Sequence, residues 1–133
     1  MACTVGGVLA DNSSGMSCGT IANSYQTLES MVIVLASGTV LDTADPDADD
    51  KLCSTEPELV ETLLRLRETC RRPEHAERIR HLFSMKNTMG YGLNSFLDHD
   101  SPSQILSHLM IGSEGTLGFI ASAVMRTLPV MPQ

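Results

Sequence analysis

Three stretches rich in glycine, serine and asparagine are the parts of this sequence best suited to contact a ligand. They are VGGVLADNSSGMSCG at 5–19, KNTMGYGLN at 86–94 and MIGSEGTLGFI at 110–120. Glycine permits positive φ and close backbone approach, and successive backbone N–H groups in such a loop can form a nest for an anion. Composition alone is equally compatible with a surface turn at 5–19 and a helix-to-strand connection at 110–120.

The spacing of these glycines excludes the best-known phosphate loops. The P-loop pattern is absent,. Gly112, Gly115 and Gly118 are three residues apart and follow a predicted helix, which disfavours a Rossmann dinucleotide site,. Tyr91, between two glycines, is expected in the core rather than against a ligand. Lys86 is expected in solvent, with contact to an anion as the alternative.

Residues for metal binding or nucleophilic catalysis are not arranged in a recognisable pattern. His75, His81, His99 and His108 have no metal-ligand spacing, and no G-x-S-x-G or Cys/His pair indicates a nucleophile,. We therefore predict no metal site and name no catalytic residue. The cysteines are widely spaced, without C-x-x-C, which favours reduced thiols over two disulfides; they are Cys3, Cys18, Cys53 and Cys70.

Length and composition predict a single folded domain over residues 1–133. The chain has 133 residues, 42% hydrophobic and 19% charged. Its net charge of −7, with 4% aromatic residues and no Trp, argues against nucleic acid as a partner,. No apolar run approaches the roughly 18 residues of a transmembrane helix. Met1–Ala10 lacks the basic flank of a signal peptide, so a cytoplasmic protein is expected.

The elements that must position these stretches include a hairpin and a late strand. The apolar, β-branched run Met31–Leu35 predicts a strand buried on both faces. A turn at Ser37-Gly38 and a paired strand at Thr39–Thr43 complete the hairpin. Phe119–Leu128 predicts a further strand, with one face formed by Ile120, Val124 and Leu128. We therefore predict an α+β fold with a mostly antiparallel sheet flanked by helices.

Three helices are predicted between these strands. Thr55–Glu58 has the form of a capping box that begins a helix, with a stripe made of Leu59, Val60, Leu63, Leu64, Leu66 and Cys70. Pro73 begins a second helix, whose apolar residues are Ala76, Ile79, Leu82 and Phe83. Ser101-Pro102 begins a third, with Ile105, Leu106, Leu109 and Met110 on its apolar face and Gly112 as its stop.

Charge is distributed unevenly over the middle of the chain. Asp42–Glu61 carries eight acidic residues and one lysine, and Arg65–Arg80 carries six of the nine basic residues. The segment TADPDADD within the acidic part is predicted to be a loop. A solvated loop followed by the basic side of a helix is the favoured interpretation, and a docking patch for a partner domain is the alternative.

Taken in order, these segments resemble the FAD-linked oxidase family, whose FAD-binding domain is of the vanillyl-alcohol oxidase type. VGGVLADNSSG resembles its flavin loop, KNTMGYGLN its N-T-x-G-Y segment, and HLMIGSEGTLGFI its most specific motif. VLASGTVLDT resembles its hairpin, although Ser37 stands where the family usually has Asp. The resemblance extends from Val5 to Pro129, and its motif variants are most similar to large bacterial D-lactate dehydrogenases that carry an iron–sulfur domain.

The resemblance implies that this chain is a fragment of a longer enzyme. It corresponds to the second subdomain of the FAD-binding domain, without the first subdomain that holds the pyrophosphate and without the cap domain that contacts substrate. The implied enzyme is a flavin-dependent D-2-hydroxyacid dehydrogenase, with D-lactate as the expected substrate and an electron acceptor at the inner face of the membrane. The implied partners are the rest of the polypeptide and, for the isolated fragment, a second copy of itself.

The resemblance also implies which residues contact FAD, and it implies no catalytic base within this chain. The flavin and pyrophosphate are expected against Gly6, Gly7, Ala10, Asn12, Ser13, Ser14 and Gly15. The neighbouring wall and the adenine contact are expected from Gly112, Ser113, Glu114, Gly115, Gly118 and Ile120. Weaker candidates are Asn87, Thr88, Gly90 and Tyr91. The alternative is a non-catalytic domain that reuses this fold to bind a ligand or partner.

Overall fold

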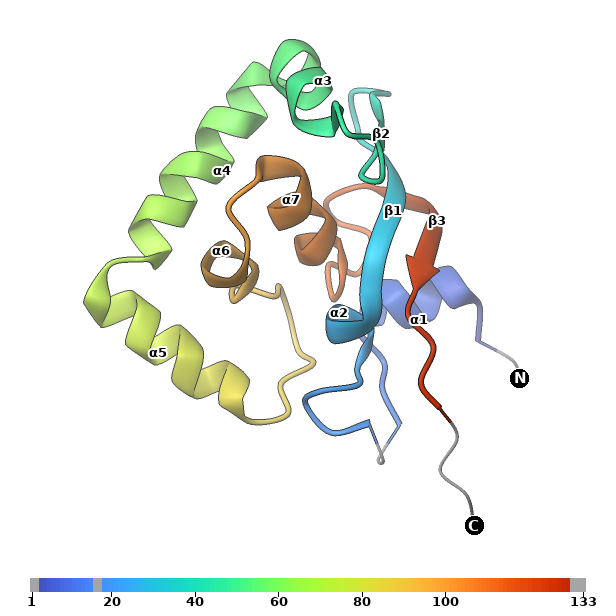
Figure 1. Cartoon of the computed structure of the whole chain (residues 1–133), viewed down its shortest axis with the longest axis vertical. Helices are drawn as coiled ribbons and strands as arrows, with labels where there is room; N and C mark the ends of the chain where they lie inside the picture. Colours follow the sequence, from blue (N-terminus) through green and yellow to red (C-terminus); the bar gives the residue numbers. More distant parts are fainter. Residues whose placement is uncertain (1–2, 16–17, 130–133) are drawn as a thin grey trace.

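A three-stranded antiparallel sheet organises the chain in this computed structural model, which describes residues 3–15 and 18–129. The strands are β1 (Leu28–Val34), β2 (Val40–Asp42) and β3 (Phe119–Met125), in the spatial order β2-β1-β3. Both pairings are antiparallel (Figure 1). The predicted α+β class with an antiparallel sheet is therefore confirmed.

The β1–β2 hairpin forms where the sequence predicts it. Val32 pairs with Asp42 and Val34 with Val40. The Leu35 N–H donates to the Thr39 carbonyl at 2.9 Å, and Gly38 turns the chain with φ +90°, a conformation that glycine adopts without steric cost. Burial differs from the prediction, because Met31 and Ile33 are buried whereas Val32 and Val34 are only partly buried.

Strand β3 also forms, but the face predicted for it is wrong beyond Ile120. Ile120 pairs with Ile33 and Ser122 pairs with Val32, so Ala121 is an extra residue, a β-bulge. A bulge exchanges the two faces of the residues that follow it. The side chains that pack against the core are consequently Ile120, Ala123 and Met125, while Val124 and Leu128 are exposed.

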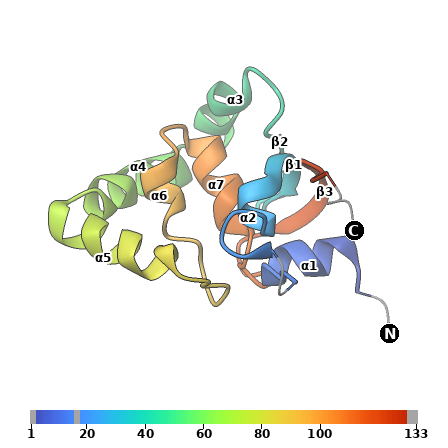
Figure 2. The ribbon, with the colours of Figure 1, turned by 60° about the horizontal axis from the view of Figure 1, so that its bottom comes forward.

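Seven helices are found among the described residues, and most lie on one side of the sheet (Figures 1 and 2). Helix α7 lies between β1 and the outer helices, and α1 lies near β3. The helices are α1 (Val5–Asp11), α2 (Ser24–Thr27), α3 (Ala48–Thr55), α4 (Pro57–Cys70), α5 (Pro73–Ser84), α6 (Ser95–Asp98) and α7 (Pro102–Met110).

Helix α7 is the central helix of the core, as its apolar pattern predicts. The Ser101 side chain accepts a hydrogen bond from the Gln104 N–H and caps its first turn,. Asp49 of α3 adds a second cap, because its Oδ1 accepts from the Ser103 N–H at 2.8 Å. The apolar face packs against the sheet and α3, and the residues buried there include Ile33, Leu41, Leu52, Ile105, Leu106, Leu109 and Met110.

The acid-rich segment folds differently from the prediction. Helix α3 begins at Ala48, inside the segment predicted to be a loop, and Asp49 and Asp50 stand in its first turn. Acidic residues there interact favourably with the helix dipole. Thr55 ends α3, so it does not cap α4 as part of a capping box.

Glu56, the residue between α3 and α4, holds the hairpin turn. Its carboxylate accepts hydrogen bonds from the hydroxyls of Ser37 and Thr39, the latter at 2.6 Å. These two bonds lower the pKa of Glu56. The carboxylate thus connects the turn to the helical layer instead of satisfying the first turn of α4.

Arg71, which directly follows α4, contacts α6 and the segment that joins α6 to α7. The Arg71 side chain donates to the carbonyls of Phe96 and His99, each at 2.9 Å, and pairs with the Asp100 carboxylate at 2.7 Å. On α4 and α5, Val60, Leu63, Ala76 and Ile79 are buried as predicted, whereas Leu66 and Leu82 are exposed. None of the described helices is long and apolar enough to cross a membrane.

His108 is a titratable side chain within the buried face of α7. It is only 5% exposed, and its Nδ1 lies 2.9 Å from the Gln104 carbonyl oxygen. Burial, followed by the charge of nearby His99, lowers the pKa of His108 from 6.5 to about 4. The imidazole is therefore neutral in the folded chain at neutral pH.

We predict that His108 makes the fold less stable as the pH falls from about 6.5 to about 4. In that range the unfolded chain binds a proton at His108 that the folded chain does not, so the free energy of unfolding falls by about 1.4 kcal/mol per pH unit, or about 3 kcal/mol in all. Urea unfolding at several pH values measures this. His108→Asn should flatten the dependence, and His75→Asn, on the exposed side of α5, should leave it unchanged. Equal slopes in all three proteins would contradict the prediction.

Candidate functional site

Two of the three glycine-rich segments meet directly. The Gly112 N–H donates to the Leu9 carbonyl at 3.2 Å, and the Glu114 N–H donates to the Ala10 carbonyl at 3.0 Å. The loop after α7 therefore lies against α1, near the beginning of β3. The beginning of the first segment and the loop 113–118 therefore lie on one face of the molecule.

The first of these segments is a helix in the structure, although the sequence indicates a loop. Thr4 caps α1, its Oγ1 accepting from the Gly7 N–H at 3.1 Å, and Leu9 anchors the helix in the core. Asn12, with φ +55°, ends it. The N–H groups of Asn12 and Ser13 donate to the carbonyls of Leu9 and Val8. These two amides are thus already used by the helix end and do not contribute to an anion nest.

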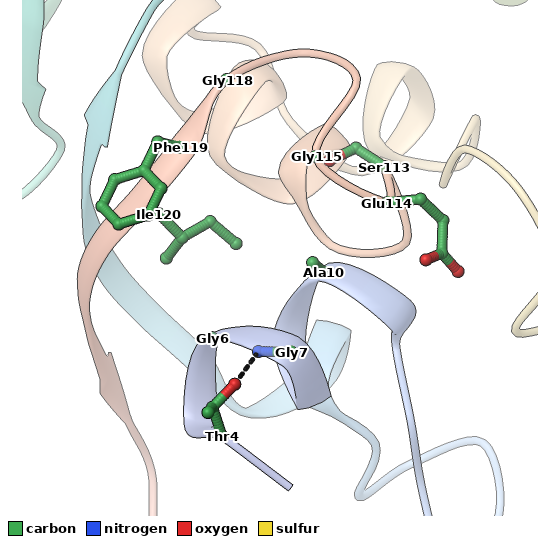
Figure 3. A pocket seen from close by; sticks show the side chains of 10 residues that line it. All are labelled: Thr4, Gly6, Gly7, Ala10, Ser113, Glu114, Gly115, Gly118, Phe119 and Ile120. Atoms are coloured by element: carbon green, nitrogen blue, oxygen red, sulfur yellow. Dashed lines mark hydrogen bonds between the residues drawn. The ribbon is translucent and has the colours of Figure 1, made fainter.

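The two segments enclose a pocket of about 520 Å³ between α1, the loop 113–118 and the first residues of β3 (Figure 3). Its walls are mostly backbone and small side chains, because four of its ten lining residues are glycine. A Cβ atom added at Gly6 or Gly115 would meet no protein atom within 4 Å. The lining residues are Thr4, Gly6, Gly7, Ala10, Ser113, Glu114, Gly115, Gly118, Phe119 and Ile120.

The third segment joins the other two at Gly112. This glycine has φ +83°, and a Cβ atom there would lie 2.7 Å from the Gly90 carbonyl oxygen and 3.5 Å from the Asn12 Cβ. A side chain at this position is therefore disfavoured both by the positive φ and by the clash of its Cβ with the Gly90 carbonyl oxygen. Gly112 is therefore the point where residues of all three segments are in contact.

Several predicted cofactor residues nevertheless lie outside the pocket. Asn12, Asn87 and Gly90 line a separate cavity of about 30 Å³, while Thr88 lines neither cavity. Tyr91 is 45% exposed, which corrects the expectation that it lies in the core, and its hydroxyl is 2.8 Å from the Thr116 Oγ1.

The end of the first segment also lies away from the pocket. The Ser13 hydroxyl donates to the Asp11 carboxylate, and the Ser14 carbonyl is 3.5 Å from the Lys86 Nζ. Gly15 is exposed and does not line the pocket. Met16 and Ser17, which belong to the same motif, fall outside the described residues.

The charged groups at the edge of the pocket are acidic. Glu114, which has φ +54°, lies close to Asp11 at the end of α1. The pKa of Glu114 is raised, first because its protonated carboxyl can donate a hydrogen bond to the Asp11 carboxylate, and then because of loss of solvent and repulsion by the Asp11 charge. No lysine or arginine is among the lining residues, and the Glu114 carboxylate points away from Phe119 (Figure 3). The pocket thus offers a neutral interior with a negative edge.

Two lining residues, Thr4 and Phe119, were missed by the sequence analysis. Thr4 directly precedes α1, and threonine commonly caps helices. The nearby glycine pair, Gly6 and Gly7, nevertheless led to the prediction of a loop instead of a helix. Phe119 is the first residue of β3, directly before the predicted adenine contact Ile120, and it is 68% exposed. Alternation along the predicted strand would have placed the two side chains on opposite faces.

Comparison with protein-family models, curated proteins and solved structures gave no match to this chain. The resemblance to FAD-linked oxidases therefore rests on the motifs alone and stays a prediction. The four cysteines are unpaired, and no group of three metal-ligating side chains is found within residues 3–15 and 18–129.

We predict that Gly112→Ala destabilises the fold by more than Gly115→Ala. Both glycines have positive φ, +83° and +76°, so both substitutions carry about 1–2 kcal/mol of conformational strain,. Only Gly112 also has a backbone oxygen at 2.7 Å from the added Cβ, which should add about 1–3 kcal/mol. Chemical denaturation of the two variants measures the difference. Equal losses would show that the contact between Gly112 and Gly90 contributes nothing.

Proposed function

We propose that this chain is the FAD-binding portion of a flavin-dependent D-2-hydroxyacid dehydrogenase, with D-lactate as the expected substrate. The observation that carries the proposal is the pocket itself, in which the two most motif-like segments form opposite walls. The glycine content of the walls favours a ligand, because it leaves backbone rather than side chains at the surface.

The pocket suits a flat, uncharged part of FAD. Its volume of about 520 Å³ lies within the roughly 300–1,000 Å³ of small-molecule sites. Open space beside Gly6 and Gly115 would let a planar ring approach the backbone closely. Phe119 and Ile120 would supply an apolar wall that excludes water from one side of the ring,.

The same pocket does not suit the pyrophosphate of FAD. Glu114 lines the pocket and Asp11 lies close to Glu114, none of the described lining residues is basic, and the chain carries a net charge of −7. An anion would be repelled there and would find no charge-assisted donors. We therefore assign the pyrophosphate to the rest of the polypeptide, which the family resemblance implies in the form of a first subdomain.

The roles of this chain's residues follow from that division. When bound, FAD would accept the Cα hydrogen of the hydroxy acid as hydride, which is chemistry that belongs to the cofactor. The backbone of Ser113–Gly115 and the α1 face at Ala10 would orient the ring. The base that removes the hydroxyl proton is assigned outside this chain, as are the cap domain and the iron–sulfur domain. Exposed Val5 and Phe119, at 73% and 68%, would favour self-association of the isolated fragment,.

The acidic edge favours the second candidate function, a non-catalytic domain that binds a neutral or cationic ligand. The pair formed by Asp11 and Glu114 is the observation behind it, since neither side chain would assist an anionic cofactor. Binding of riboflavin in the pocket separates the two candidates, because only the first requires this pocket to hold a flavin ring.

We predict that this chain alone binds FAD only weakly, with a dissociation constant in the millimolar range. Without donors for the pyrophosphate, charge-assisted hydrogen bonds of about 1.5–3 kcal/mol each are lost, and each 1.4 kcal/mol is a tenfold loss of affinity. A titration of the ¹⁵N-labelled chain with FAD and with riboflavin measures this. Amide shifts should be confined to the pocket walls, and riboflavin should bind at least as well as FAD.

Matched substitutions in α1 test whether these shifts report the pocket. Ala10→Leu should abolish them, because the larger side chain fills the cavity. Val5→Leu, on the same helix but outside the pocket lining, should not change them. Retention of stoichiometric FAD through gel filtration would contradict the prediction of weak binding. Absence of any pocket shift with either flavin would contradict the proposed function.

A further inference from the structure

Another cavity, of about 360 Å³, lies between the beginning of β1 and the helices α6 and α7. It shares no lining residue with the pocket described above. Its lining is polar and aromatic rather than glycine-rich, which points to a different ligand chemistry. The residues are Tyr25, Gln26, Leu28, Asp98, His99, Gln104 and His108.

Three rings form a packed cluster at this cavity. The His99 and His108 ring centroids are 3.9 Å apart, with an angle of 33° between the planes. The Tyr25 ring meets His108 edge-on at 4.9 Å. Tyr25 and His108 are 6% and 5% exposed, so their positions are fixed by the core rather than by solvent.

The hydrogen bonds of this cluster fix which atoms remain available to a ligand. The His108 Nδ1 lies 2.9 Å from the Gln104 carbonyl oxygen. A carbonyl oxygen only accepts, so Nδ1 carries the proton and Nε2 keeps its lone pair. The Tyr25 hydroxyl and the Asn94 side-chain amide both donate to the Asp98 Oδ2, at 2.8 and 3.1 Å. These two bonds orient the Asp98 carboxylate and leave its Oδ1 available.

The balance of charge at the cavity is negative. Burial lowers the pKa of both His99 and His108, which keeps the two imidazoles neutral at neutral pH. Among the described residues that line the cavity, Asp98 is then the only charged side chain. Arg71 lies nearby, but its guanidinium is engaged by the Asp100 carboxylate and by the carbonyls of Phe96 and His99. The charged group that a ligand would meet there is therefore a hydrogen-bond acceptor, the Asp98 carboxylate.

We propose that this cavity binds an organic cation with N–H donors, a guanidinium or primary ammonium group. The Asp98 carboxylate balances its charge, the His108 Nε2 accepts one N–H, and the rings of Tyr25 and His99 supply a face for cation–π contact. The proposal is independent of the flavin function, because the two cavities have no residue in common.

Titration of the ¹⁵N-labelled chain with butylguanidinium and butylammonium tests the proposal. Long-range ¹H–¹⁵N spectra report the His108 and His99 ring nitrogens directly, and both should shift in a saturable way. Butyramide, which is neutral, should give no saturable shift. Tetramethylammonium, which has the charge but no N–H donor, should bind at least tenfold more weakly. A blocked arginine tripeptide shows whether the cation can be carried by a protein side chain or must be a free small molecule.

Two variants and a matched control decide the role of the side chains. Asp98→Asn keeps an acceptor for Tyr25 and Asn94 but removes the charge, and should weaken binding by roughly 10- to 100-fold. His108→Asn retains a donor for the Gln104 carbonyl and removes Nε2, and should weaken it by about tenfold. Glu29→Gln removes an exposed charge of β1 outside the cavity and should change binding less than twofold. Circular dichroism verifies that each variant is folded. Equal affinity for butyramide, unchanged affinity in Asp98→Asn, or no saturable shift in the parent chain would each overturn the proposal.

Discussion

The antiparallel pairing of β1 with β3 is the interaction on which both cavities depend. It places a late strand beside an early one, so that Val34 pairs with Phe119 and Leu28 pairs with Met125. Because β3 is held there, the loop that precedes it must pass over α1, where the amides of Gly112 and Glu114 find carbonyl partners. The same pairing fixes the first residues of β1, and with them Tyr25, against α7.

Close approach of backbone to backbone is the second requirement, and glycine satisfies it. At Gly118 an added Cβ would lie 2.9 Å from the Val34 carbonyl, and at Gly112 it would lie 2.7 Å from that of Gly90. These contacts tie the loop to β1 on one side and to the segment before α6 on the other. These close backbone contacts hold the walls of the proposed flavin pocket in place, and the walls carry few side chains that could change position.

The charged side chains at both proposed sites are acidic, so neither site is suited to an anion. The first pocket has Asp11 and Glu114 at its edge, and the second has Asp98 as its charged group. Both agree with the net charge of −7. A cofactor with a pyrophosphate would need basic groups or free amides from elsewhere, whereas a cation would be attracted without further assistance. The chain therefore supplies shape and apolar walls to the first ligand, and shape, charge and acceptors to the second.

Local patterns in the sequence determined the hairpin, the helix at Pro102–Met110 and the positions of the glycine-rich segments, because period, caps and turn residues act over a few neighbours. Local patterns did not predict helix α1, because its glycines are typical of a loop and the helix is held by the burial of Leu9 in the core. They did not predict the bulge at Ala121 either, because the bulge depends on the register of β3 with β1. The sequence also left His99 and His108 as isolated histidines. Only the tertiary structure stacked them beside Tyr25, since the chemistry of a buried side chain is set by neighbours that are remote in sequence,.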